Sequence, residues 1–393
     1  MNPAHSPPAL ADSQLAALHK LRLHFASLPD SRMPGRILHR LDEVLMIAFC
    51  SVLSDNDSFT DMETFATTQM CWLRSFLPLK NGAPSHDVFR NVFMALRPEA
   101  LVGILQKWCG ELGGKHIAID GKVLRGTYDA GAGKCLVHVL RAWVCAEGIS
   151  AAQVSCAQKS NELEALPRLL QALQLKGAVV TIDAMACHPV IAEQIIAQGG
   201  DYVLTLKANQ KNTLAAVVEH FERADAAATP PAQHQRHETV ELSHGRFERH
   251  EYTATSNLDW FLKSWKWAGL QSVVRVRRSS HRGGQQSGEL LEETHYYLSS
   301  LPADVMRQAA LIRGHWSVEN SCHWVLDVTF GEDHCQVRDA NAAHNLSIVR
   351  EISAKVLKLH PSKSSLRAKR KRAALDPNFR AELLALIPHT FDA

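Results

Sequence analysis

The segment between residues 115 and 206 constrains the fold most, because short β-branched runs and helical segments follow one another there in a definite order. The pattern predicts three strands, a helix, a strand, a helix and a strand, over residues 115–120, 135–145, 149–157, 162–173, 178–183, 189–198 and 201–206. Adjacent strands favour antiparallel pairing, whereas strands separated by a helix favour parallel pairing through a crossover. We therefore expect a mixed sheet that begins antiparallel and becomes parallel.

This order is that of an RNase H-like core in the α/β class. A doubly wound nucleotide-binding sheet would not open with three consecutive strands. No strand signal interrupts the helical patterns before this core, and a strand-rich stretch follows a Pro/Ala-rich loop after it. The chain is thus expected to comprise a disordered tail (1–12), an all-α domain (13–112), a core (113–360) with a β-insertion at about 236–300, and a basic C-terminal helical tail (361–393).

Three distant carboxylates are the candidates for chemistry. Asp120 and Asp183 each close a β-branched run, and Glu319 lies on an expected helix. Converging carboxylates need cations between them, and hard Mg²⁺ or Mn²⁺ with oxygen ligands suits in-line phosphoryl transfer. Turn formation or helix capping would also explain the aspartates, and a solvated polar stripe would explain Glu319. His323 and Asp327 share the helical face of Glu319, and Asp327 is the reserve for the third acid.

Basic and amide side chains near these positions are candidate contacts to a DNA backbone. They are Lys122, Arg125, Lys159, Lys207, Asn209 and Gln210. Capping explains Asn209 equally well, and the basic run 367–372 is typical of a solvated face. The net charge is only +3, so nucleic-acid binding would depend on local patches.

Three other classes are disfavoured by the composition and the distribution of residues. Nine scattered cysteines without a CxxC pair indicate a reducing compartment and disfavour a zinc site. The longest apolar stretch, residues 44–53, is too short to span a membrane. A cytosolic metal-binding scaffold is also disfavoured, because no cluster of Cys and His ligands is present.

Ordered strings along almost the whole chain carry a resemblance to a known family. They are LPDSR (28–32), NGAPSHDVF (81–89), AIDGKVLRG (118–126), KSNEL (159–163), TIDAMAC (181–187), YVLTLKANQ (202–210), HGRFERH (244–250), YYLSSL (296–301) and HWSVENSCHWVLDVTFGED (315–333). The chain resembles DDE-type insertion-sequence transposases, in the group that contains the H-repeat-associated proteins. The resemblance implies an N-terminal associated domain and an RNase H-like catalytic domain, in which Asp120, Asp183 and Glu319 are catalytic and hold two Mg²⁺ or Mn²⁺ ions.

The resemblance also implies an activity and partners. We expect cleavage at insertion-sequence ends and strand transfer into target DNA. The protein is expected to act as a homodimer on double-stranded DNA, in the prokaryotic cytoplasm and associated with the nucleoid. Many related transposases carry Tyr, Arg and Lys at positions where this chain has Ile312, His315 and Leu326. Two alternatives stay open: a DNA-binding relic without catalysis, and an RNase H-like nuclease without strand transfer.

Overall fold

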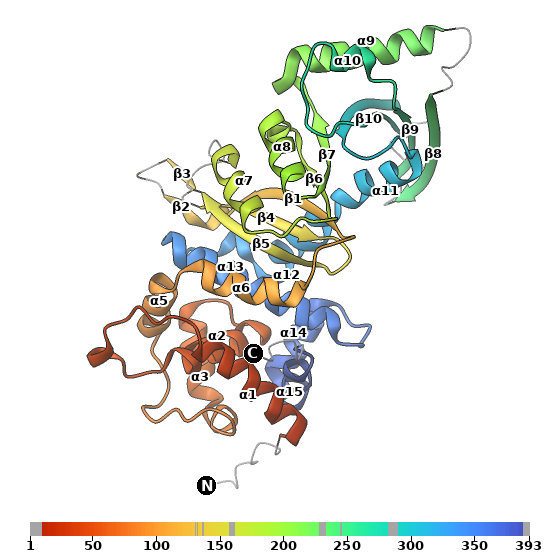
Figure 1. Cartoon of the computed structure of the whole chain (residues 1–393). Coiled ribbons are helices and arrows are strands. Elements are labelled where there is room, and N and C mark those ends of the chain that lie inside the picture. The colour runs from red at the N-terminus through yellow and green to blue at the C-terminus, as the bar shows by residue number, and fades with distance from the viewer. Residues whose placement is uncertain are drawn as a thin grey trace.

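The N-terminal part of the protein is helical, as the sequence predicts. The computed structural model describes residues 10–387 apart from 130, 132, 136, 157–161, 228–232, 244–245 and 282–289. The first helices, red to orange in Figure 1, are α1 (Asp12–Ala26), α2 (Leu41–Leu53), α3 (Phe59–Thr68), α4 (Met70–Leu73), α5 (His86–Ala95) and α6 (Pro98–Cys109). Every residue of α2 is buried, so this apolar helix forms the centre on which its neighbours pack.

The core of the protein is a mixed sheet. Its first strands are β1 (His116–Val123), β4 (His138–Val144), β5 (Ile149–Cys156), β6 (Val179–Ile182) and β7 (Asp201–Leu206). β1, β4 and β5 pair antiparallel, whereas β6 lies parallel to both β1 and β7. The spatial order β5-β4-β1-β6-β7 is that of an RNase H-like core, so the expected α/β fold class is confirmed. A small hairpin of β2 (Tyr128–Asp129) and β3 (Lys134–Cys135) separates β1 from β4.

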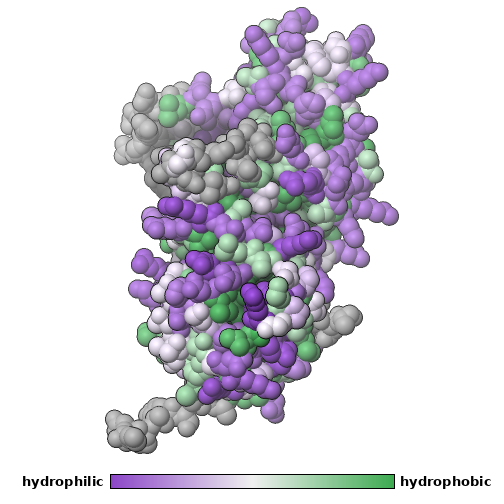
Figure 2. All heavy atoms as spheres, turned by 90° about the vertical axis from the view of Figure 1, so that its left-hand side faces the viewer, coloured by the Kyte–Doolittle hydropathy of each residue, from purple (hydrophilic) through white to green (hydrophobic). Residues whose placement is uncertain are grey.

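The strand-rich stretch after the core continues the same sheet. Its elements are α9 (Lys211–Ala226), β8 (His234–Ser243), β9 (Arg246–Thr255), α10 (Asp259–Leu262), β10 (Ser272–His281) and β11 (Leu290–Ser299). β11 pairs antiparallel with β7, and β10, β9 and β8 follow outward, which gives a nine-stranded sheet within the described residues. We call β8 to β11 the β-extension. On the face shown in Figure 2, hydrophilic side chains predominate at the end of the molecule that holds the β-extension (Figures 1 and 2).

Helices cover both faces of the core. α7 (Glu162–Gln171) packs on β4 and β5, and α8 (Pro189–Ala197) on β7. The later helices are α11 (Val305–His315), α12 (Trp324–Phe330), α13 (Ala340–Leu359), α14 (Leu366–Leu375) and α15 (Pro377–Ala385). α11 packs on β1 and β6, while α13 lies between β5 and the N-terminal helices α2, α5 and α6. The long buried helix α13 therefore joins the sheet to the helical part.

The basic C-terminal run is partly buried in the structure and partly exposed. α14 lies against α2, and α15 lies against α1 (Figure 1). Lys369 and Arg370 are buried, whereas Arg367, Lys371 and Arg372 are exposed. The expectation of a solvated run is therefore wrong for Lys369 and Arg370. Lys369 donates to the carbonyls of Leu357 and His360 at the end of α13, and Arg370 pairs with Asp57, far away in the sequence. No helix among the described residues is long and apolar enough to cross a membrane.

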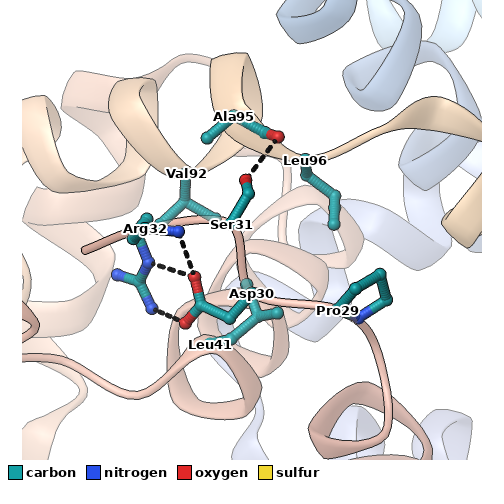
Figure 3. A pocket seen from close by; sticks show the side chains of 8 residues that line it. All are labelled: Pro29, Asp30, Ser31, Arg32, Leu41, Val92, Ala95 and Leu96. Atoms are coloured by element: carbon teal, nitrogen blue, oxygen red, sulfur yellow. Dashed lines mark hydrogen bonds and ion pairs between the residues drawn. The ribbon is translucent and has the colours of Figure 1, made fainter. Parts of the chain in front are cut away.

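The LPDSR string forms a structural tie between the α1–α2 connection and α5. The Arg32 guanidinium donates hydrogen bonds of 2.9 and 2.7 Å to the two carboxylate oxygens of Asp30 (Figure 3). The Ser31 hydroxyl donates to the Ala95 carbonyl oxygen over 3.0 Å. The hollow between these groups is only about 10 Å³, room for about one water molecule. The contacts of this string are therefore structural, and the hollow beside it is too small for a ligand larger than water.

Gly126→Ala is expected to destabilise the protein by about 1–3 kcal/mol, because the added methyl group overpacks a backbone contact. A Cβ at this position would lie 1.9 Å from the carbonyl oxygen of Cys335. Gly103→Ala is the control, since a Cβ there meets no atom within 4 Å. It lies inside α6, where alanine is favoured over glycine by up to about 1 kcal/mol. Urea unfolding should shift in opposite directions for the two variants, and unchanged stability of Gly126→Ala would contradict the contact.

Candidate active site at the ends of β1 and β6

The register of two parallel strands places Asp120 and Asp183 side by side. Ile119 of β1 is paired with Ile182 of β6, so the next residue of each strand is an aspartate at the same edge of the sheet. Asp183 follows β6 and caps a short 3-10 turn, Ala184–Ala186. Asp120, however, lies within β1, which runs on to Val123 along β4. The expectation that Asp120 closes its strand is therefore wrong, whereas it does close the segment paired with β6.

A π-helical segment between α11 and α12, Glu319–His323, brings the third acid to Asp120. The backbone N–H of Trp324 donates to the Glu319 carbonyl, five residues back. His323 Nδ1 lies 3.1 Å from Glu319 Oε2 and 3.5 Å from Asp120 Oδ2. One ligand atom from each of these three residues lies within 4.8 Å of the other two. Two acids almost two hundred residues apart thus share one small volume.

Neighbouring donors and charges keep the carboxylates of Glu319 and Asp183 ionised. The hydrogen bond with His323 lowers the pKa of Glu319, and partial burial opposes it less strongly. Burial acts to raise the pKa of Asp183, but the Ala184 N–H and the Lys207 ammonium together lower it. The Ala184 N–H donates to Asp183 Oδ1 over 2.6 Å, and Lys207 Nζ lies 3.4 Å from the same oxygen. Both groups therefore offer negatively charged oxygens at neutral pH.

A chain of two histidines and a threonine lies beside the aspartates. Thr181 Oγ1 is 2.9 Å from His116 Nε2 and 2.9 Å from His315 Nδ1. Burial lowers the pKa of His315, while Asp120 and Asp183 act to raise it. Burial, with a smaller effect of His315, lowers the pKa of His116 to about 4, so that ring is neutral. His315 occupies one of the three positions at which the sequence departs from related transposases, and it lies close enough to Asp120 and Asp183 for both to influence its pKa.

Lys122 and Asp327 are engaged with each other. The Lys122 ammonium contacts the Asp327 carboxylate and lies 3.4 Å from Glu332 and 3.8 Å from Asp333. Lys122 is also buried, so this side chain serves an internal ion-pair cluster rather than an open surface. Asp327, the reserve acid, is part of that cluster, whereas the candidate cation-binding group among the described residues comprises Asp120, Glu319 and His323.

The other candidate DNA contacts differ in their solvent exposure and in the partners that they already have. Arg125 is 79% exposed, with its Nε 3.7 Å from an oxygen of Asp333. Lys207 is exposed next to Asp183, and Asn209 donates to the Ala184 carbonyl over 2.7 Å, which ties the turn after β7 to the turn after β6. Gln210 ends the 3-10 turn Ala208–Gln210. Lys159 lies outside the described residues.

A pocket of about 180 Å³ opens beside the two aspartates. Its lining includes Asp120, Asp183 and Glu162, with apolar side chains of α7 and the sheet around them. The Glu162 carboxylate contacts His138 Nε2, and a Cβ on Gly121 would lie 2.5 Å from that nitrogen. The sequence interpretation missed the pair of Glu162 and His138. The glycine after Asp120 was its only signal, because the two partners are distant in sequence.

The donor set fits a divalent cation. Carboxylate oxygens suit Mg²⁺ and Mn²⁺, and imidazole nitrogen is a further common ligand. Asp120 and Glu319 would hold the ion with His323 beside them, and Asp183 is the neighbour that offers a second carboxylate from the same edge. Among the described residues, Asp183 forms an ion pair with the Lys207 ammonium.

Comparisons with known proteins match this chain over most of its length. The family model described as Transposase DDE domain matches residues 111–353, and the one described as DDE_Tnp_1-associated matches residues 22–109. The "H repeat-associated putative transposase YhhI" of Escherichia coli (strain K12) is 33% identical over 94% of this chain and 98% of its own length. The "Uncharacterized protein in dhlA 3'region" of Xanthobacter autotrophicus is 39% identical over 67% of this chain and 90% of its own length. Among solved structures, a piggyBac transposase synaptic complex with hairpin DNA aligns with 96% of this chain and 82% of its own, at 12% identity and a TM-score of 0.37.

Proposed function

The chain belongs to the Transposase DDE domain family, and we propose that it is a DNA transposase that cuts the ends of its own insertion sequence and joins them to target DNA. The observation that carries this proposal is the meeting of Asp120 and Glu319 around His323, next to Asp183 in strand register. The resulting acidic edge suits phosphodiester chemistry with divalent cations.

The proposed reaction has two steps at one site. Water attacks the phosphodiester at the element end, which releases a free 3′-hydroxyl, and that hydroxyl then attacks a phosphodiester of the target. Two bound Mg²⁺ or Mn²⁺ ions would supply charge neutralisation and activation of the attacking oxygen. Asp120, Asp183 and Glu319 would hold these ions. The nearby ring of His315 is held by its hydrogen bond with Thr181, and the two aspartates act to raise its pKa. No covalent enzyme intermediate is required, because positioning and charge neutralisation carry the catalysis.

Exposed basic groups around the acidic edge would bind the DNA backbone. Lys207 next to Asp183, Arg125 beyond β1 and Gln210 are the proposed phosphate contacts. The Asn209 amide donates to the Ala184 carbonyl and so positions the turn that carries Lys207. Lys159, which lies outside the described residues, remains a proposed contact on the basis of the sequence alone. Lys122 is assigned to the ion pair with Asp327. We further propose that two copies pair two element ends as a homodimer, and that the protein works in the cytoplasm at the nucleoid.

A cleavage assay on DNA that carries the inverted repeats flanking the gene tests the proposal. With Mg²⁺ we expect 3′-hydroxyl ends and, after addition of target DNA, joined products. EDTA should remove both. Cleavage without joined products would favour a nuclease on the same core, and a gel shift without any cutting would favour a DNA-binding relic.

Lys207→Ala is expected to weaken binding of end-containing DNA and to reduce the slope of log affinity against log salt concentration by about one. The reason is that one phosphate contact, with its counterion release, is lost. Binding is measured by fluorescence anisotropy without divalent ions across a salt series. Lys371→Ala, an exposed lysine on α14, is the control and should leave the slope unchanged. An unaltered slope for Lys207→Ala would contradict the assigned contact.

A further inference from the structure

A site made of three acids alone does not explain why the buried ring of His323 lies between two of them. Its ring is buried, with 4% of the side chain exposed, although it lies at the solvent edge where Glu319 is 58% exposed. Its Nδ1 points at Glu319 and Asp120, and its Nε2 has no hydrogen-bond partner among the described residues. Buried polar atoms are normally paired. The polar contacts of the His323 ring are made by Nδ1, which faces the carboxylates of Glu319 and Asp120.

The distances around Nδ1 are those of atoms that share one cation. Two ligand atoms about 2.1 Å from an ion lie about 3.0 Å apart at right angles and at most about 4.2 Å apart when opposite. Nδ1 lies 3.1 Å from Glu319 Oε2 and 3.5 Å from Asp120 Oδ2. A hydrogen bond to Glu319 alone would not require the ring to lie against Asp120 as well.

The backbone at this point supports the same conclusion. The segment that carries both Glu319 and His323 is π-helical, and such segments are rare and occur frequently at functional sites. It begins at Glu319 and ends at His323, so the irregular turn spans the two ligands. The following helix, α12, keeps Asp327 on Lys122 and away from the cation-binding group.

We propose that His323 Nδ1 is a direct ligand of the cation held between Asp120 and Glu319. The inference rests on the proposed function, since it takes the metal-dependent reaction as given and adds a nitrogen to the ligand set. An imidazole ligand shifts the preference of a carboxylate site from Mg²⁺ towards Mn²⁺ and later transition metals. The protein should therefore bind Mn²⁺ more tightly than Mg²⁺.

Mn²⁺ electron paramagnetic resonance on the full chain tests this directly. Titration should show bound Mn²⁺, and pulsed spectra should show modulation from one coordinated nitrogen. In His323→Gln the nitrogen signal should vanish and the dissociation constant for Mn²⁺ should rise about tenfold or more. His188→Gln, at an exposed histidine that caps α8, is the matched control and should change neither quantity. Circular dichroism establishes that each variant is folded.

The outcomes separate this inference from the proposed function. Bound Mn²⁺ without a nitrogen signal would overturn the inference alone and leave His323 as a hydrogen-bond donor to Glu319. A nitrogen signal that survives in His323→Gln and is lost in His315→Asn would also overturn it, because the ligand would then be His315. No bound Mn²⁺ at all would overturn both the inference and the metal-dependent reaction. If His323→Gln does not fold, ¹⁵N-histidine labelling of the wild-type protein with His315→Asn as comparison makes the same decision.

Discussion

Cleavage of DNA that carries the element ends should fall by about 10³-fold or more in Asp120→Asn, a loss of about 4 kcal/mol of transition-state stabilisation. The substitution keeps the shape of the side chain and removes the negative charge that faces Glu319 and His323. Asp183→Asn should have a comparable effect, because its carboxylate comes from the neighbouring strand at the same edge. The measurement is single-turnover strand cleavage with Mg²⁺, accompanied by a DNA-binding assay that should change little.

Two further variants decide which residue is the third acid. Glu319→Gln should lose cleavage to a similar extent, whereas Asp327→Asn should retain most of it, because the Asp327 carboxylate is paired with Lys122. Thermal unfolding identifies any loss that comes from folding. Wild-type cleavage by Asp120→Asn and Asp183→Asn would show that the catalytic site lies elsewhere, and loss confined to Asp327→Asn would move the third role to that residue.

The sequence predicted the parts of the site that depend on local pattern and strand order. The β-branched runs before Asp120 and Asp183 are visible without a structure, and parallel pairing of their strands puts both residues at one edge. The helical spacing of four residues correctly put His323 on the side of Glu319. The sequence did not predict the π-helical turn, because neither composition nor periodicity distinguishes such a turn from an α-helix.

The local sequence pattern could not predict contacts between segments that are distant in the chain. Lys122 follows Asp120 by two residues and looked like a phosphate contact, but along β1 it faces Asp327 and Glu332. The C-terminal basic run looked solvated because charge runs usually are, yet Arg370 lies in the interior. Both misassignments share one cause: a charge is exposed or buried according to which distant segments fold over it.

Arg370 joins three segments that are distant in sequence. Its Nη2 donates to both carboxylate oxygens of Asp57, over 2.7 and 2.8 Å, and its Nη1 lies 2.9 Å from Asp55. Its Nε and Nη2 also donate to the Val52 carbonyl at the end of α2, and its guanidinium lies 4.2 Å from the ring centre of Phe330. The side chain therefore links α14 to the N-terminal helices and to α12, the helix that continues from Glu319.

Arg370→Ala is expected to reduce the free energy of unfolding by about 3 kcal/mol, because removal of the buried arginine leaves the partly buried Asp57 carboxylate without its partner. Burial already raises the pKa of Asp57, and the loss of Arg370 would leave that carboxyl and the Val52 carbonyl without this partner. Urea unfolding followed by circular dichroism gives the size of the loss. Lys371→Ala, one residue along α14 and exposed, should stay within about 0.5 kcal/mol of wild type.

The same variant tests whether the helical part supports the active site. If α14 holds α12 in place through Arg370, then Arg370→Ala should lower cleavage at temperatures where the protein is still folded, because Glu319 and His323 precede α12 directly. Lys371→Ala should cleave as wild type does. Unchanged stability in Arg370→Ala would mean that Asp57 is satisfied without the arginine, and unchanged cleavage would mean that Arg370 does not position the segment that carries Glu319 and His323.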